Sequence, residues 1–217
     1  MWKVKASTEP VGPGPNFFSD DPENVWVDAV GRLHLQITHR AGRWRAAEVI
    51  LDHSLGHGRY RFSVASRIER LDSNVVLGLF TWSDNPDFSN REIDIEFGRW
   101  ADAPSRNARY TVQPADRPGH GHAFVQPRGA PTTHEFRWTP GEVSFLSATT
   151  IGMTIKRWTY RGDDVPIAGD ERTRINLWLQ GGAPPTDGAA TEVLVSRFAF
   201  TPHRPRTVHP PSHGALA

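Results

Sequence analysis

At residues 92–97 the chain reads Glu92-Ile93-Asp94-Ile95-Glu96-Phe97, so acidic and large apolar residues alternate without interruption. In a β-strand successive side chains point to opposite faces, so one face of this segment would carry carboxylates and the other face groups suited to a core. Like charges at alternate positions on one strand face repel each other, and a strand selected only for stability would interleave other residues there. The acids therefore indicate a function beyond folding.

The segment 75–82 just upstream repeats this two-faced pattern, with Leu77 and Leu79 on one face and Phe80 and Trp82 on the other. A solvated strand face would tolerate the acids, and a cation site of the calcium type would use their oxygen atoms. An aromatic ring beside acids instead suits a sugar ring, which has apolar faces and polar edges. Together the two segments favour a carbohydrate site.

Composition limits the range of partners. The 217 residues include 25 basic and 24 acidic side chains, and the formal net charge is +1. This balance argues against a nucleic-acid partner held by phosphate neutralisation. There are no cysteines, so neither disulfides nor thiolate chemistry contributes and the redox compartment stays open. No apolar run has the length of a membrane span or a signal peptide. We therefore expect no membrane partner, and a chain that is either cytoplasmic or a secreted or periplasmic form whose export signal has been removed.

Strand-like segments bounded by Gly, Pro, Asn and Asp recur along the whole chain, and no window shows a long helical period. Many alternating segments combined with 8 Trp and 11 Phe predict an all-β fold of two stacked antiparallel sheets, a jelly-roll β-sandwich. No Pro/Gly/Ser-rich linker divides the chain, so we expect one catalytic domain over residues 1–200, a mobile Pro- and His-containing tail over 201–217, and a monomer. The predicted strands besides 75–82 and 92–97 cover residues 32–38, 59–65, 107–113, 175–180 and 192–200.

The polar faces of these strands share one chemistry. Asn107 and Arg109 alternate with core residues in one strand, and Asn176 and Trp178 do so in another. Acids, amides, an arginine and two tryptophans would then line one sheet face, and a face curved into a groove would hold a long polysaccharide. An ordinary solvated sheet face is the alternative, because isolated tryptophans also occur on such faces.

The stretch 92–97 resembles the active-site signature of glycoside hydrolase family 16, the clan of lichenases, laminarinases and xyloglucan transglycosylases. The resemblance covers roughly residues 10–200, about the size of a whole domain. It implies a concanavalin A-like jelly roll with a concave substrate groove. Weaker similarity to family landmarks occurs at residues 47–49, 56–60, 79–82, 134–140 and 176–178.

The resemblance implies a retaining mechanism in which Glu92 is the nucleophile and Glu96 the general acid and base. Their Cα atoms would lie about 13 Å apart at about 3.3 Å per residue, whereas retaining carboxyl groups need about 5–5.5 Å, so the side chains must lean together. Neighbouring carboxylates cannot all ionise freely, so one pKa should be raised. Asp94 is the expected proton-sharing partner that keeps Glu92 charged and oriented.

Other residues would bind the substrate. We expect Trp82 and Trp178 to stack on sugar rings, although either could be a packed edge aromatic. Glu48, Asn107 and Arg109 are candidates for hydrogen bonds to sugar hydroxyls, although polar residues on strand surfaces often have no such role. Trp100 follows the acidic strand by a short turn and is expected to cap one end of the groove.

The sequence assigns no metal site and no required cofactor. His134 occupies a position where the family has a histidine, and we interpret it as a structural residue. Five further histidines lack a metal-ligand spacing and are interpreted as loop residues: His120, His122, His203, His209 and His213. The resemblance leaves open a structural calcium on the outer sheet, which ligand spacing does not locate.

The uninterrupted Glu-x-Asp-x-Glu form resembles the lichenase and xyloglucan branch, since laminarinases and agarases usually carry an extra, bulged residue. It favours endo-acting cleavage of a β-glucan backbone with β-1,3 or β-1,4 linkages. Arg91 stands where that branch commonly has an acid, and the 98–100 turn and the loop expected over 114–131 also depart from it. Transglycosylation by the same residues and non-catalytic polysaccharide binding remain the alternatives.

Overall fold

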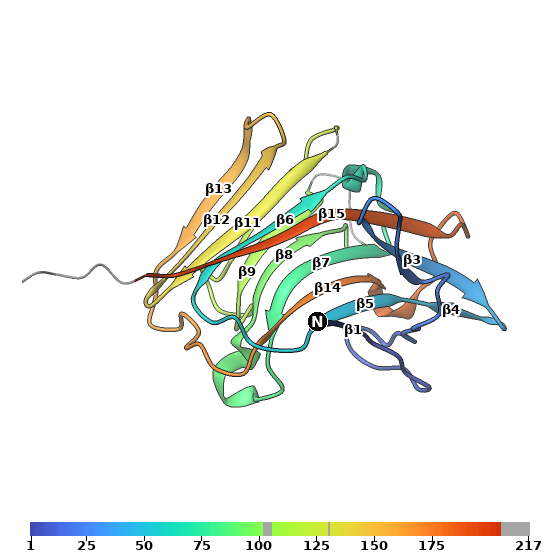
Figure 1. The fold of residues 1–217 in the computed structure, drawn as a ribbon, viewed down its shortest axis with the longest axis horizontal. Helices are drawn as coiled ribbons and strands as arrows, with labels where there is room; N and C mark the ends of the chain where they lie inside the picture. Colours follow the sequence, from blue (N-terminus) through green and yellow to red (C-terminus); the bar gives the residue numbers. More distant parts are fainter. Residues whose placement is uncertain (102–105, 130, 205–217) are drawn as a thin grey trace, which may run out of the picture.

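The computed structural model describes residues 1–101, 106–129 and 131–204, and over these ranges the chain forms two antiparallel sheets stacked face to face (Figure 1). The predicted all-β sandwich is confirmed. Helical structure in the described part consists of three short 3-10 segments: η1 (Ile68–Arg70), η2 (Pro86–Arg91) and η3 (Gln180–Gly182). None of the helices described there is long and apolar enough to cross a bilayer.

The sheet that carries the acidic segment, here called the inner sheet, joins strands from distant parts of the sequence. The acidic strand β8 lies between β7 and β9, close to the middle of the sheet. The strand order is β1 (Trp2–Val4), β5 (Ala47–Leu51), β14 (Arg172–Leu179), β7 (Val75–Trp82), β8 (Ile93–Phe97), β9 (Ala108–Val112) and β10 (Gly121–Phe124).

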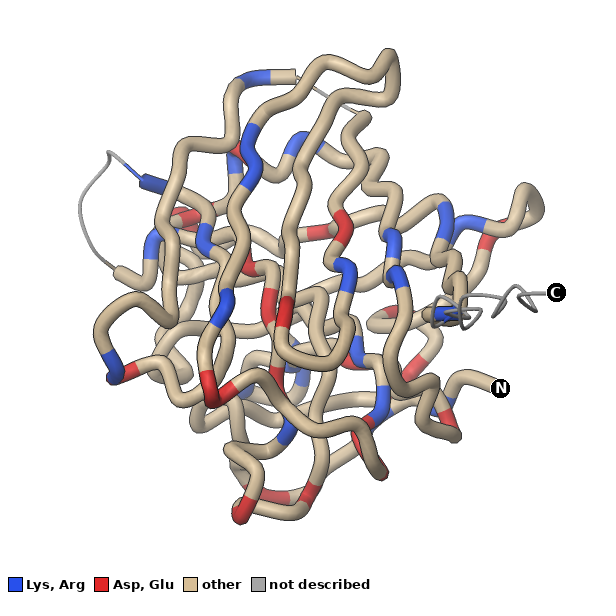
Figure 2. The backbone as a smooth tube through the Cα atoms, turned by 90° about the vertical axis from the view of Figure 1, so that its left-hand side faces the viewer, with Lys and Arg blue, Asp and Glu red and all other residues tan. Residues whose placement is uncertain are grey.

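The second, outer sheet is built mainly from longer strands, and β4 (Arg43–Arg45) pairs with one of them outside the main path. Basic and acidic residues both occur along the strands on the side of the molecule that Figure 2 presents, in keeping with the net charge of +1. The strand order is β13 (Thr154–Tyr160), β12 (Glu142–Thr149), β11 (Thr132–Thr139), β6 (Gly58–Val64), β15 (Thr191–Pro202), β3 (Leu33–Arg40) and β2 (Val25–Val27).

Alternate residues from both sheets fill the core between them. Ile93, Ile95 and Phe97 of β8 are fully buried, as are Tyr60 and Phe62 of β6 on the facing sheet. Burying a side chain of this size contributes about 1.5–3 kcal/mol, so one face of β8 is held firmly in the core. Its opposite face, with the acids, must then point to the outside of the sandwich.

Two expectations about loops differ from the structure. The region 114–131 contains strand β10, and His120 beside it is only 4% exposed rather than part of an open loop. The reason is tertiary: His120 Nδ1 lies 3.0 Å from the carbonyl oxygen of Val112, and its Nε2 lies 2.8 Å from the hydroxyl of Tyr160. The last strand, β15, also continues through Pro202, beyond the expected start of the tail at residue 201. Most of the predicted mobile tail, residues 205–217, lies outside the described residues, and His209 and His213 lie there too.

Candidate active site

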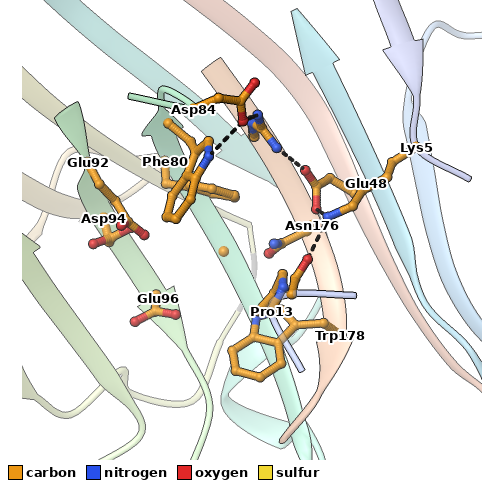
Figure 3. A pocket seen from close by; sticks show the side chains of 14 residues that line it. Lys5, Pro13, Glu48, Phe80, Asp84, Glu92, Asp94, Glu96, Asn176 and Trp178 are labelled. Carbon is orange, nitrogen blue, oxygen red and sulfur yellow. Dashed lines mark hydrogen bonds and ion pairs between the residues drawn. The ribbon is translucent and has the colours of Figure 1, made fainter. Parts of the chain in front are cut away.

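A cavity of about 440 Å³ lies on the outward face of the inner sheet and is lined by all three acids (Figure 3). Its position follows from strand register, because residues paired across neighbouring strands point to the same face. One cross-strand row runs through five adjacent strands, from β5 to β9. Its members are Glu48, Asn176, Gly78, Glu96 and Arg109.

The acids lie side by side along one strand and face the cavity. Asp94 and Glu96 belong to β8, where Asp94 is 5% exposed and Glu96 is partly buried. Glu92 precedes the strand in an extended conformation, with φ of −103° and ψ of 126°, so it continues the alternation. The carbonyl oxygen of Glu92 accepts a hydrogen bond of 3.1 Å from the backbone N–H of Gln113, the residue that follows β9. All three carboxyl groups therefore share one space, as the alternation predicts.

Burial raises the pKa of each carboxyl group, because a charged form loses solvation in the cavity wall. The pKa of Glu96 rises to about 7, and the positive charge of Arg109 acts in the opposite direction. Burial also raises the pKa of Glu92 to about 8, against the effects of hydrogen bonding to Asp94 and of the charge on Arg174. The pKa of Asp94 lies well above its ordinary value because of burial and the charges of Glu92 and Glu96.

Hydrogen bonding between Asp94 and Glu92 acts on the two groups in opposite directions. It lowers the pKa of Glu92 and raises the pKa of Asp94. It therefore favours a proton on Asp94 over one on Glu92, which is the arrangement that a nucleophilic Glu92 carboxylate needs. Burial of Glu96 raises its pKa and so favours its protonated form.

Aromatic side chains flank the acids. Trp82 and Trp178 both line the cavity, and so does Phe80, whose place in the wall follows from its alternation with Trp82. The indole N–H of Trp82 donates to Asp84 over 3.3 Å, which fixes the ring at the rim. Trp100 does not line the cavity; it packs against the small apolar cluster that contains Trp178. The capping role of Trp100 stays a prediction.

Glu48 lines the cavity, but its carboxylate is fully buried and engaged in ion pairs. Its Oε2 lies 2.9 Å from the Lys5 ammonium, and its Oε1 lies 3.1 Å from Nη1 of Arg174. Arg174 also lies 3.8 Å from Asp84. Arg174, Lys5 and Asp84 are not among the site residues predicted from the sequence. Alternation with Asn176 could have revealed Arg174, whereas Lys5 comes from the N-terminal segment, and no periodicity connects it to the site.

Asn107 and Arg109 have different neighbours, and neither of them lines the cavity. The side-chain amide of Asn107 donates to the carbonyl oxygen of Gln126 over 3.2 Å, and its oxygen accepts from the N–H of Gln126 over 2.7 Å. Asn107 therefore joins two chain segments and does not line the cavity. Arg109 is directly opposite Glu96 on the neighbouring strand, and its guanidinium lies across Gly121, which has no Cβ to obstruct it.

His134 is a buried structural residue. Its Nδ1 lies 2.8 Å from the Ser147 hydroxyl, its Nε2 lies 2.8 Å from the Thr132 hydroxyl, and burial lowers its pKa to about 3. In the part of the chain that the structure describes, no group of three or more His, Cys, Asp or Glu side chains could hold a metal ion.

Comparison with known proteins places this geometry in a familiar fold. No model of a protein family matches the sequence, and no curated protein sequence is similar to it. Solved structures do match. The β-glucanase of Bacillus licheniformis is 15% identical, covers 94% of this chain and 92% of its own, and gives a TM-score of 0.69.

Two further structures illustrate the range of functions on this fold. One is described as an immunostimulatory antigen and pseudo β-1,3-glucanase of Mycobacterium tuberculosis (18% identity, 94% and 91% of the two chains, TM-score 0.67). The other is a family 16 protein of the Bacteroides ovatus mixed-linkage glucan system in complex with a G4G4G3G product (11% identity, 92% and 94%, TM-score 0.67). The chain therefore has the jelly-roll fold of family 16 β-glucanases, as its motifs predicted.

Proposed function

We propose that this protein is an endo-acting retaining glycoside hydrolase of family 16 that cleaves a β-glucan with β-1,3 or β-1,4 linkages. The observation that carries the proposal is the placement of Glu92, Asp94 and Glu96 on one strand face, in a 440 Å³ cavity whose walls hold Trp82 and Trp178. Flat apolar rings beside hydrogen-bonding groups fit the faces and edges of sugars. A polysaccharide-binding surface alone has no need for this crowded charge.

The proposed mechanism needs an ionised Glu92 and a protonated Glu96. Glu92 attacks the anomeric carbon as a carboxylate, while Glu96 gives its proton to the glycosidic oxygen of the departing chain. A covalent glycosyl-enzyme results. Glu96 then takes a proton from water, the water oxygen attacks the anomeric carbon, and the carboxylate of Glu92 is released. Asp94 supplies the hydrogen bond that keeps Glu92 ionised during the first step.

Release of reducing ends from mixed-linkage β-glucan, laminarin and xyloglucan tests this proposal. We expect the unmodified protein to act on one of these polymers, and Glu92→Ala or Glu96→Gln to lower the rate about 100- to 10,000-fold. Glu142→Gln on the outer sheet is the matched control and should keep full activity. Longer products that form when oligosaccharide acceptors are added would identify a transglycosylase. Binding without turnover by the unmodified protein would refute the hydrolase and leave a glucan-binding protein.

A further inference from the structure

Arg91, immediately before Glu92, has an unusual backbone and a buried side chain. It is 9% exposed, and its φ is +47°. Ser89 and Asn90 precede it with φ values of +48° and +59°. Three consecutive non-glycine residues in the left-handed region cost about 1 kcal/mol or more each, and such conformations persist only where the surroundings impose them.

The guanidinium of Arg91 binds segments that are far apart in the sequence. Its Nη1 donates to Asp170 over 2.5 Å and to the Ser83 hydroxyl over 3.3 Å, and its Nε donates to the carbonyl oxygen of Ile167 over 2.9 Å. The ring of Phe88 lies 4.1 Å from the guanidinium carbon. These contacts tie η2 to the residue after β7 and to the loop between β13 and β14. Here we call Arg91, Ser83 and Asp170 the Arg91 clamp.

The clamp acts on the side of Glu92 that faces β7. Regular pairing between β7 and β8 extends only to Asp94, so Glu92 lies beyond that ladder, whereas on the β9 side its carbonyl oxygen accepts from Gln113. The Thr81 hydroxyl replaces the ladder, because it donates to the carbonyl oxygen of Arg91 over 2.8 Å and accepts from the N–H of Ile93 over 3.2 Å. The backbone on both sides of Glu92 is therefore fixed, on one side through the residue whose guanidinium is clamped.

We propose that Arg91 is a positioning residue for Glu92: the clamp sets the backbone at residues 89–91 so that the Glu92 carboxylate points at the anomeric carbon of the bound sugar. This inference rests on the proposed hydrolase function. An arginine suits the role because its planar fork reaches several acceptors at once and stays charged when buried, which a lysine does not reproduce. Gly169 provides the space for this side chain, since a Cβ at residue 169 would lie 2.6 Å from the guanidinium carbon of Arg91.

Steady-state kinetics on a 2,4-dinitrophenyl β-glucan oligosaccharide provide the first test. Misplacement of a reacting group by about 1 Å can cost about 100-fold in rate. We therefore expect Arg91→Met to lower kcat by about 10- to 100-fold with KM changed less than about threefold, and Arg91→Lys and Asp170→Asn to fall between. Arg117→Met is the matched control, because Arg117 forms a similar 2.6 Å ion pair with Asp164 away from the acids. An unchanged kcat in Arg91→Met would refute the proposal that the clamp positions Glu92.

Azide rescue separates positioning from general damage to the cavity. In Glu92→Ala, azide can attack the anomeric carbon directly, so one anion enters, dinitrophenolate leaves as another, and a glycosyl azide of inverted configuration forms. Adding Arg91→Met to Glu92→Ala should leave the azide-dependent rate unchanged within about twofold, because no carboxylate remains to be positioned. A loss as large as that in the single Arg91→Met variant would show that Arg91 only maintains the cavity.

The proposed role of the clamp and the proposed hydrolase function can be refuted separately. If the unmodified protein is active and Arg91→Met is fully active, the role of the clamp is refuted and the hydrolase function is not. Absence of turnover by the unmodified protein refutes the hydrolase function. The crystal structure of Arg91→Met then tests whether the clamp positions Glu92. A displaced Glu92 in an intact sandwich supports it, and an unmoved Glu92 refutes it. Should Arg91→Met fail to fold, Arg91→Lys and Asp170→Asn serve in its place.

Discussion

Single residues around Glu96 set the protonation of the site. Glu96 and Arg109 are directly paired across two strands, and the charge of Arg109 lowers a pKa that burial raises. A general acid must stay protonated up to its working pH, so its pKa sets the basic limb of the activity profile. Arg109 thus lowers the pKa of Glu96 from the neighbouring strand.

We expect Arg109→Met to move the basic limb of the kcat/KM profile to higher pH. Removing the positive charge favours the neutral form of Glu96, so its pKa rises further and the protonated acid persists at higher pH. A pH series from 4 to 10 on the β-glucan that the protein cleaves measures the shift, because the departing sugar oxygen must take the proton of Glu96, with Arg137→Met on the outer sheet as the control. An unchanged limb, or one that moves to lower pH, would contradict this role for Arg109.

At the scale of elements, strands β7 and β14 leave space in front of the acids. Gly78 lies between Asn176 and Glu96 in the cross-strand row, and a Cβ at this position would lie 2.4 Å from the side-chain oxygen of Asn176. That oxygen is buried and has no hydrogen-bond partner among the described residues. The glycine thus allows the amide to lie across β7 on the floor of the cavity.

Gly78→Ala should weaken binding of a glucan oligosaccharide about tenfold, because the added methyl group forces Asn176 out of its position. Calorimetric titration of the inactive Glu96→Gln background measures the effect without turnover. Gly12→Ala is the matched control, since Gly12 lines the same cavity and a Cβ there meets nothing within 4 Å. Equal affinity in the two variants would show that Asn176 adapts or takes no part in binding.

Period-two alternation predicted the elements that carry the acids, because strands of a sandwich need one apolar face each. It therefore placed Glu92, Asp94 and Glu96 together and put Trp82 and Trp178 beside them. The alternation could not predict β10, because this strand is only four residues long and the adjacent His120 is buried through a contact with Tyr160 of β13. Nor could it show that Asn107 is hydrogen-bonded to Gln126. The ion pairs of Glu48 with Lys5 and Arg174 were equally hidden, since these contacts form only after the chain folds.

At the scale of the whole molecule, the acid cluster opposes the stability of the fold. The carboxyl groups have raised pKa values when folded, about 8 for Glu92 and about 7 for Glu96. The unfolded chain loses these protons near pH 4.3, so their favourable contribution is complete below that pH and is lost as pH rises through 7 and 8. The free energy of unfolding should therefore fall between pH 5 and pH 8.

Asp94→Asn should raise the free energy of unfolding at pH 8 by about 1 kcal/mol or more, because an amide needs no proton to remain neutral in the buried site. The same change should have little effect at pH 5. Urea unfolding at both pH values measures it, with Asp87→Asn in the exposed η2 segment as the control. Equal stability of Asp94→Asn and the unmodified protein at pH 8 would show that the acid cluster does not destabilise the fold.

The two faces of β8 would therefore respond to mutation in opposite ways over evolutionary time. Substitution of Ile93, Ile95 or Phe97 would open a cavity in the core, so purifying selection on folding alone maintains them. Substitution of the acids would improve folding, so only selection for the proposed activity would maintain them. A lineage released from that selection would lose its acids by drift while its sandwich persisted.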